Sequence, residues 1–328
     1  MKQLRLSLLL LLATLTLSTF SQRPRIGLAL GGGGAKGAAE VGVLKVMEEE
    51  GIRPDYIAGT SIGSIVGGLY ALGFSADSIY RLFHDADWAE LLSDGWFHRA
   101  DGYEWLTPDG VPMPTERFGQ ALGRSGSEAT RPFWQRGLVR GKLIRNFFEK
   151  LTRSQRRKDF DRLPIPFRAI AVDMKTGQEI VLSKGHLADA MRASMSIPAL
   201  FEPVEWGEWM LVDGGVRNNF PVDVVRQMGA DVVIGVDLSQ LNRRSAAVEP
   251  EPSQGLFDMV FNSLMGLLGE DKYADNLGDV DLYVNPDLGS YGPYSFSTSA
   301  VDEMYQMGYA AASALRPQLR ALKEKSAR

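Results

Sequence analysis

A serine between two glycines, in the stretch Gly59-Thr-Ser-Ile-Gly63, is the first candidate for chemistry in this sequence. It follows a short apolar segment and precedes a longer one. The Gly-x-Ser-x-Gly pattern is typical of a nucleophile elbow, in which a strained strand-to-helix turn exposes a serine hydroxyl. Serine is also a common helix N-cap, and the pattern arises by chance in many chains. On this motif alone, Ser61 is either a nucleophile or a helix cap.

A second glycine-rich stretch, Gly31-Gly-Gly-Gly-Ala-Lys-Gly37, also lies between an apolar segment and a predicted helix. Consecutive glycines let backbone N–H groups converge on one point, which is what an oxyanion hole requires. The same stretch could hold a phosphate group. The P-loop pattern, however, needs Ser or Thr directly after Gly-Lys, and here Lys36 precedes another glycine. A dinucleotide fingerprint is matched only in part. A nucleotide-binding protein therefore stays as an alternative.

The third candidate is Asp213-Gly-Gly215, at the end of a short apolar segment. The carboxyl ends of strands form the rim where α/β folds place functional side chains, although Asp-Gly also forms turns for local reasons. The chain contains three histidines, His84, His98 and His186. None follows Asp213, so the serine–acid–histidine order of α/β hydrolases cannot be filled. If Ser61 is a nucleophile, its base is a carboxylate that needs burial and a direct hydrogen bond to the serine.

The elements that must position these groups alternate between short apolar strands and helices. Strands are predicted at 25–30, 56–58, 167–174, 179–183, 209–212, 231–238 and 281–284, and helices at 35–50, 62–72, 141–151, 187–196, 221–228 and 298–323. This alternation indicates an α/β fold with a mostly parallel sheet covered by helices. We expect one domain over residues 22–328, with an irregular insertion or lid at 87–140 and a C-terminal extension, 240–328, packed on the core.

The first 21 residues differ from the rest of the chain. Lys2 and Arg5 precede an apolar run at 6–20 that is short for a membrane span, and small residues stand before a cut at Gln22. We expect a signal peptide over 1–21 and a bacterial protein that is exported to the periplasm or secreted. An uncleaved anchor is the alternative.

Composition narrows the chemistry further. The chain has no cysteine and a formal net charge of −4. The first fact excludes disulfides, thiolate metal sites and a cysteine nucleophile. The second predicts no nucleic-acid partner, because no basic field is present.

Taken together and in order, the three glycine-rich elements resemble those of the patatin-like phospholipase family. Other stretches that resemble the family are Asp55–Gly59, Leu163–Phe167, Arg192–Pro198 and Phe201–Val204. The resemblance covers roughly residues 24–240. It implies a three-layer α/β sandwich, with a central mostly parallel sheet and helices on both faces, and a hydrolase of lipid carboxylic esters.

Carried over by position, the resemblance implies a Ser–Asp dyad in which Ser61 is the nucleophile and Asp213 is the base. The backbone N–H groups of Gly32, Gly33 and Gly34 would form the oxyanion hole. The positions that match the remainder of the motifs are Lys36, Gly37, Gly59, Gly63, Gly214 and Gly215. The reaction would pass through an acyl-enzyme that water then hydrolyses, with no metal and no organic cofactor.

The expected substrate is a lipid ester of the phospholipase A or lysophospholipase type. The protein would reach it as a peripheral protein on a membrane surface. A catalytically silent lipid-binding or interaction module is the alternative from a different class of function.

Overall fold

The computed structural model describes residues 23–95, 137–153, 159–239 and 270–326. The predicted signal peptide at 1–21 lies outside the described residues. So do His98 and most of the predicted insertion at 87–140.

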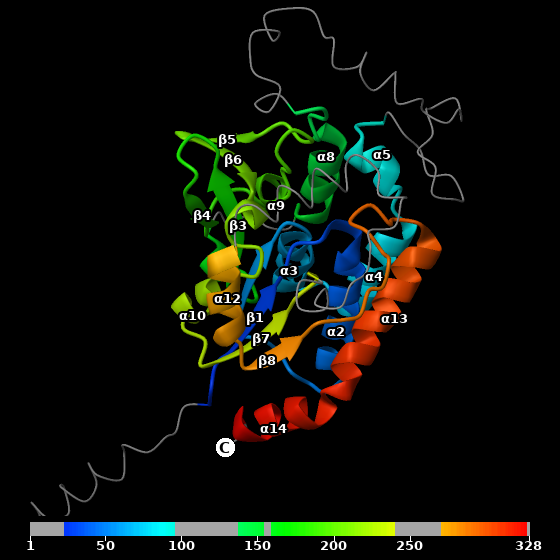
Figure 1. The fold of residues 1–328 in the computed structure, drawn as a ribbon, viewed down its shortest axis with the longest axis vertical. Helices are drawn as coiled ribbons and strands as arrows, with labels where there is room; N and C mark the ends of the chain where they lie inside the picture. Colours follow the sequence, from blue (N-terminus) through cyan, green and yellow to red (C-terminus); the bar gives the residue numbers. More distant parts are fainter. Residues whose placement is uncertain (1–22, 96–136, 154–158, 240–269, 327–328) are drawn as a thin grey trace, which may run out of the picture.

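Within the described residues, eight strands form one central sheet (Figure 1). The strand order is β5-β6-β3-β2-β1-β7-β8, and β4 pairs with β3 off this path. The strands are β1 (Ile26–Leu30), β2 (Tyr56–Thr60), β3 (Phe167–Asp173), β4 (Glu179–Leu182), β5 (Val204–Trp206), β6 (Trp209–Asp213), β7 (Val232–Val236) and β8 (Leu282–Val284). The five strands that lie side by side in the order β3-β2-β1-β7-β8 are parallel to one another. Strands β4 and β6 pair with β3 in the antiparallel direction.

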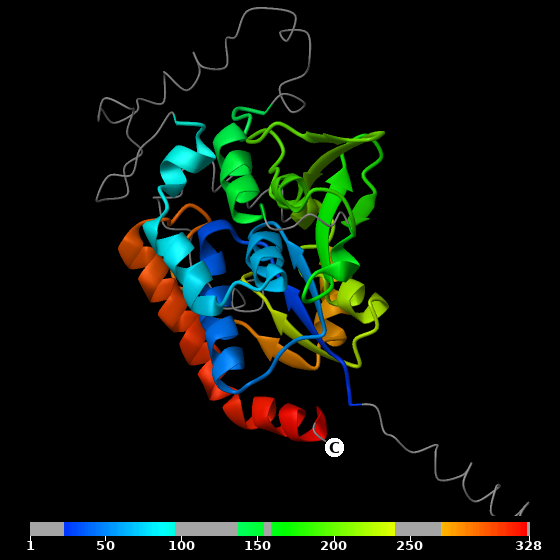
Figure 2. The ribbon, with the colours of Figure 1, turned by 180° about the vertical axis from the view of Figure 1, so that it is seen from behind.

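Helices cover both faces of this sheet (Figure 2). One face carries α2 (Gly37–Glu49), α3 (Ile62–Leu72), α4 (Ala76–Asp85), α9 (Leu187–Ser194) and α13 (Thr298–Ala314). The other face carries α10 (Val222–Gln227) and α12 (Glu270–Gly278). Beyond the carboxyl ends of the parallel strands lie α5 (Trp88–Leu92) and α8 (Lys142–Leu151), and α14 (Arg316–Ser326) lies at the opposite end (Figure 1). Short 3-10 turns are η1 (Gly34–Lys36), η3 (Phe160–Arg162) and η4 (Gly214–Val216).

Strand β1 is buried along its whole length because both of its faces are covered. Leu28 and Leu30 belong to the core under α2 and α3, and Ala29 belongs to a separate core under α10. Because successive side chains of β1 are buried in one core or the other, every position of the strand is apolar and no polar face is left. The predicted three-layer α/β architecture is therefore confirmed.

The C-terminal region agrees with the prediction in its strand and departs from it in its helix. The single helix predicted at 298–323 is wrong, because α13 ends at Ala314 and α14 begins at Arg316. Pro317 has no N–H to donate to the carbonyl of Ser313, and its ring collides with that turn of a continuous helix. The strand predicted at 281–284 is present as β8, which pairs with β7 in parallel. Neither β5 nor α12 was predicted from the sequence.

Helix α13 packs closely against α2, the helix that follows the glycine-rich loop. A Cβ atom at Gly308 would overlap the backbone carbonyl of Ala39, and one at Gly42 would overlap the carbonyl of Tyr305. The two backbones therefore touch at a pair of glycines. Because α2 carries the loop at its N-terminus, this contact holds the base of the loop in place.

We predict that Gly308→Ala lowers the free energy of unfolding by about 2 kcal/mol, a typical cost of overpacking. Alanine is the better helix former, so a loss of stability reports the helix contact rather than helix propensity. Urea unfolding measures it. The matched control is Gly278→Ala at the exposed end of α12, where nothing lies within 4 Å of the added Cβ. Equal stability of the two variants would contradict this account of the contact.

Candidate active site

Ser61 lies in a strained turn between β2 and α3. Its backbone angles are φ 53° and ψ −121°, which a residue with a side chain rarely adopts. Although Ser61 occupies the N-cap position of α3, its side chain makes no capping hydrogen bond. The helix-cap interpretation therefore does not account for this serine. The strained backbone is the geometry that a nucleophile elbow requires.

The two glycines of the motif allow three backbones to meet at this turn. A Cβ atom at Gly59 would overlap the carbonyl of Gly63, and a Cβ at Gly63 would overlap the carbonyl of Leu30. Any side chain at either position would separate α3 from β2 or from β1. The elbow is thus built by close packing as well as by its own turn.

Hydrogen bonds hold the strained backbone of Ser61 from both sides. Its N–H donates to Ser194 Oγ at 2.9 Å, and the Ser194 hydroxyl donates to the carbonyl of Ile170 at 2.6 Å. Its carbonyl accepts from Ser64 Oγ at 2.7 Å. Ser194 is a residue that the sequence did not single out. The stretch Arg192–Pro198, where it lies, supported the family resemblance without suggesting a role for its hydroxyl.

Asp213 reaches the site from an antiparallel strand. We expected it at the rim formed by the carboxyl ends of parallel strands, but β6 runs against β3, which lies between β6 and β2. The strand register explains why Asp213 lies near Ser61. Ala171 of β3 pairs with Asp213, and the preceding residue, Ile170, pairs with Thr60. Asp213 and the residue before Ser61 therefore lie at neighbouring levels on either side of β3.

The carboxyl group of Asp213 is fully buried. Its Oδ1 accepts from the N–H of Gly215 at 2.8 Å, and Oδ2 has no hydrogen-bond partner among the described residues. Burial raises the pKa of this carboxyl to about 7, while the Gly215 N–H and the Ser61 side chain oppose the increase. The Ser61 side chain therefore lies close enough to affect the pKa of this carboxyl, although the two groups form no hydrogen bond of ordinary geometry. Such bonds are often long before a substrate binds.

The glycine-rich loop offers fewer free donors than the sequence suggested. The N–H of Gly31 donates to the carbonyl of Val236 at 3.0 Å, and the N–H of Gly32 donates to that of Asn219 at 3.2 Å. No described residue accepts from the N–H groups of Gly33 or Gly34. Two adjacent donors therefore remain for an oxyanion, rather than the three expected. The engaged donors also make the loop a poor phosphate cradle, since such a site uses several converging N–H groups.

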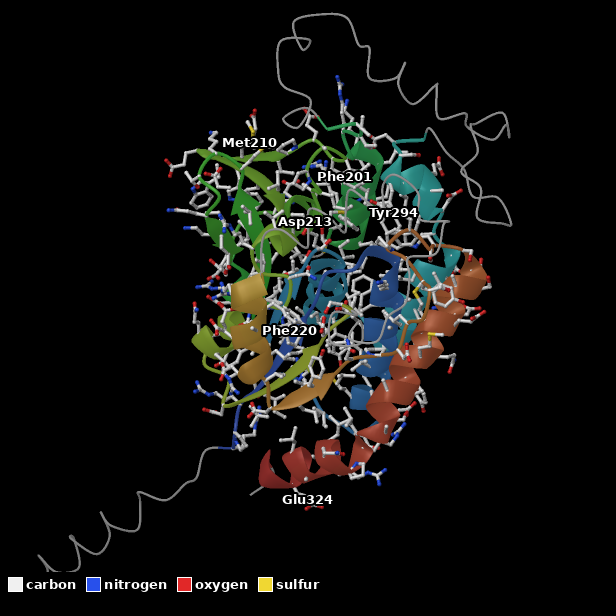
Figure 3. The ribbon with its side chains drawn as sticks, in the orientation of Figure 1. Phe201, Met210, Asp213, Phe220, Tyr294 and Glu324 are labelled. Atoms are coloured by element: carbon white, nitrogen blue, oxygen red, sulfur yellow. The ribbon has the colours of Figure 1, made fainter. Side chains whose placement is uncertain are left out.

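A largely apolar pocket opens beside Ser61. Its volume is about 40 Å³, which is room for a few water molecules at most. Its lining residues are Gly34, Ser61, Ile62, Ile65, Trp88, Leu92, Met195, Ile197, Phe201, Pro293, Tyr294 and Phe296. Phe201 and Tyr294 lie at the same end of the molecule as Asp213, whereas Phe220 lies nearer the middle (Figure 3). Trp88 stacks on Phe296 with ring centres 5.1 Å apart.

The other motif positions lie around this site. Gly37 begins α2 directly below the loop, Gly214 begins η4 after Asp213, and Lys36 ends η1. The described histidines lie elsewhere: His84 is on α4, where its Nδ1 contacts Asp85 at 2.8 Å, and His186 precedes α9. Neither lines the pocket.

Glu40 is a buried acid that the sequence analysis missed. It lies in the first turn of α2, is fully buried, and neither carboxyl oxygen has a hydrogen-bond partner among the described residues. Burial raises its pKa well above the usual range, opposed by the N–H of Gly31. Burial thus favours the neutral form of this carboxyl near the loop. The sequence did contain a signal of this burial, because Glu40 lies three residues before Val43, on the apolar face of a predicted helix.

Among the described residues, no three histidine, aspartate or glutamate side chains lie together in a group that could hold a metal ion. No helix in those parts of the chain is long and apolar enough to cross a membrane.

Comparison with known proteins gives a consistent match. The family model of the patatin-like phospholipases matches residues 28–226. The lysophospholipase nte1 of Aspergillus fumigatus is 28% identical over 307 residues, an alignment that covers 87% of this chain and 18% of that protein. An uncharacterized NTE family protein of Mycobacterium bovis is 31% identical over 219 residues, covering 67% of this chain and 50% of that protein. The chain thus spans under a fifth of the length of the fungal relative.

A solved structure shares the fold. The crystal structure of VipD from Legionella pneumophila superposes with a TM-score of 0.50 and 14% sequence identity, covering 90% of this chain and 67% of that one. At this identity the likeness concerns the fold alone.

We predict that Ser194→Ala slows the reaction of Ser61 with a fluorophosphonate probe by about 10–100-fold, because a small displacement of a reacting group has effects of this size. The variant leaves the N–H of Ser61 without its acceptor. The labelling rate of the purified protein is the measurement.

The control for this variant is Ser75→Ala. Ser75 also accepts a backbone N–H, as the N-cap of α4, but it lies past the C-terminal end of α3, whereas Ser61 lies at its N-terminal end. Its loss costs about 1 kcal/mol of stability and should leave labelling unchanged. If Ser194→Ala reacts at the wild-type rate, Ser194 does not position the side chain of Ser61.

Proposed function

The chain belongs to the patatin-like phospholipase family, and from that premise we propose that it hydrolyses carboxylic esters of lipids with Ser61 as nucleophile and Asp213 as base. One observation carries this proposal. A serine in a strained elbow borders an apolar pocket, and its side chain lies close enough to the fully buried carboxyl group of Asp213 to oppose the rise of that carboxyl's pKa. Among the described residues, one oxygen of this carboxyl has no hydrogen-bond partner.

The first half of the proposed reaction forms an acyl-enzyme. Ser61 Oγ attacks the ester carbonyl carbon while Asp213 Oδ2 takes the hydroxyl proton. The carbonyl electron pair moves to oxygen, and the N–H groups of Gly33 and Gly34 donate to this oxyanion. When the tetrahedral intermediate collapses, the bond to the leaving alcohol breaks, and the alcohol takes the proton from Asp213.

The second half releases the acyl group. A water molecule attacks the acyl-enzyme carbonyl and gives a proton to Asp213. The bond to Ser61 Oγ then breaks, the fatty acid leaves, and the proton returns to the serine. No step needs a histidine, because one buried carboxyl accepts and returns the proton in both halves.

The pocket favours a lipid acyl chain over a polar substrate. Its walls are aliphatic and aromatic apart from the Ser61 end, and pockets of this kind bind apolar groups by burial. An ester of the phospholipase A or lysophospholipase type fits this chemistry. The name of the fungal relative, a lysophospholipase, is consistent with that choice.

We also propose that the protein is exported and that it contacts a lipid surface peripherally. Export to the periplasm or out of the cell rests on residues 1–21, and peripheral contact with a lipid surface rests on the nature of the substrate. The rival function is a silent lipid-binding or interaction module, which would share the pocket but not the reactive serine.

The deciding experiment compares wild type with Ser61→Ala and Asp213→Asn. We expect the fluorophosphonate probe to label only the wild type, at Ser61, and lysophosphatidylcholine in detergent micelles to be hydrolysed only by the wild type. The variants should bind micelles as the wild type does. Micelle binding by a wild type that neither reacts with the probe nor cleaves the ester would favour the silent module.

The pH dependence provides a separate prediction. Asp213 must be ionised to take a proton, and burial raises its pKa to about 7. We therefore expect kcat/KM to rise about tenfold per pH unit below pH 7 and to level off above it. Initial rates between about pH 5 and pH 9 measure this. A profile that is flat across that range would mean that another group is the base.

A further inference from the structure

Asn219 holds the glycine-rich loop by two hydrogen bonds to one residue. Its backbone carbonyl accepts from the N–H of Gly32 at 3.2 Å, and its Nδ2 donates to the carbonyl of Gly32 at 3.3 Å. These groups belong to the two successive peptide planes that flank the Gly32 Cα. One residue, 187 positions away in the sequence, thus fixes both planes.

The second hydrogen bond has a directional consequence. In a planar trans peptide, the carbonyl of one residue and the N–H of the next point in opposite directions. The described chain contains no cis peptide. Because Asn219 Nδ2 holds the carbonyl of Gly32, the N–H of Gly33 is directed away from that side chain. This N–H is one of the two loop donors that no described residue uses.

The same side chain lies beside the nucleophile. A Cβ atom placed on Gly32 would overlap Asn219 Oδ1 and would lie 3.2 Å from Ser61 Cβ. The carboxamide, the loop and Ser61 therefore meet at one point. Asn219 Oδ1 is also buried without a hydrogen-bond partner among the described residues. A buried polar atom left unsatisfied is uncommon in folded proteins and suggests that the side chain is kept for its other hydrogen bond.

We propose that Asn219 is a positioning residue of the oxyanion hole: its carboxamide holds the Gly32–Gly33 peptide so that the Gly33 N–H faces the ester oxygen when Ser61 attacks. Asn219 itself does not touch the substrate. The inference rests on the proposed function, and it extends that function to a residue outside the three glycine-rich motifs.

Only the side-chain bond should matter for this role. In Asn219→Ala, the Gly32 carbonyl loses its donor, but the Gly32 N–H keeps the backbone carbonyl of residue 219. The loop therefore stays attached while the peptide after Gly32 is free to rotate. Asn219→Asp keeps the shape, replaces the donor by an acceptor, and adds a negative charge near the developing oxyanion.

The experiment measures kcat, KM and transition-state affinity for the full chain. The substrate is lysophosphatidylcholine, and the probe of the oxyanion hole is an alkyl trifluoromethyl ketone, whose adduct with a serine carries an oxyanion. Asn276→Ala is the matched control. Asn276 lies on α12 and is buried; it donates to Asn218 Oδ1 at 3.0 Å and accepts from the N–H of Asp223 at 3.0 Å, so it contacts the neighbour of Asn219 but neither partner belongs to the glycine-rich loop.

We expect Asn219→Ala to lower kcat by about 10–100-fold, which is below the full loss of an oxyanion donor. The inhibition constant of the ketone should rise by the same factor, because it reports the same hydrogen bond. KM should change less than about threefold, since the apolar pocket is intact. Asn219→Asp should lose more, and Asn276→Ala should keep both kcat and ketone affinity.

Two results would overturn the inference while leaving the proposed function intact. One is a wild type that is active together with an Asn219→Ala variant that matches Asn276→Ala. The other is a loss of kcat in Asn219→Ala without a loss of ketone affinity, which would indicate a structural role only. A wild type that neither cleaves the ester nor binds the ketone would instead overturn the proposed function, and this inference with it.

Discussion

The hydroxyl group of Ser194 joins the strained turn of Ser61 to the central strand β3, and the geometry of the site depends on this link. A residue with a side chain at positive φ costs of order 1–3 kcal/mol and persists only where its surroundings fix it. Here Ser194 accepts the N–H of Ser61 and donates to Ile170, while Ser64 donates to the Ser61 carbonyl. The glycines on either side let α3 lie against β2 and β1. The segment that follows Ser194 also holds Asp213, the proposed base, because the carbonyl of Ser196 accepts the N–H of Asp213 at 2.8 Å.

The site is assembled from strands that run in both directions. The loop after β1 and the elbow after β2 lie at the carboxyl rim of the parallel strands, as in other α/β folds. Asp213 comes from β6, which returns antiparallel along β3 to the level of the elbow. Because β6 runs back along β3, it ends at Asp213 opposite Ala171, two residues below the end of β3 at Asp173. The direction of β6 thus places this carboxyl inside the sheet rather than at its rim.

Local patterns were sufficient to predict much of this molecule. Short apolar runs bounded by glycine predicted β1, β2 and α3. In each of them the hydrophobic pattern and the glycine that ends the element lie within a few residues of one another. Long-range hydrogen bonds could not be predicted in this way. The Gly32 N–H was expected to be free, but Asn219 occupies it from a distant part of the chain. The role of the Ser194 hydroxyl, the burial of Glu40 and the direction of β6 also depend on tertiary packing. At Pro317 the signal was local, and the predicted helix should have been ended there.

The burial of Asp213 also links the stability of the fold to pH. Its pKa is raised from 3.8 to about 7 in the folded state, so the folded protein binds this proton more tightly than the unfolded chain does. The stabilisation from that proton is complete below about pH 4, declines as the pH rises, and is lost above about pH 7. This difference in pKa corresponds to roughly 4 kcal/mol of stability. In the pH range where the ionised carboxylate can act as a base, the protein therefore folds against the full cost of a buried charge. The fold elsewhere must supply that free energy, and the neutral acid is the form that the structure itself prefers.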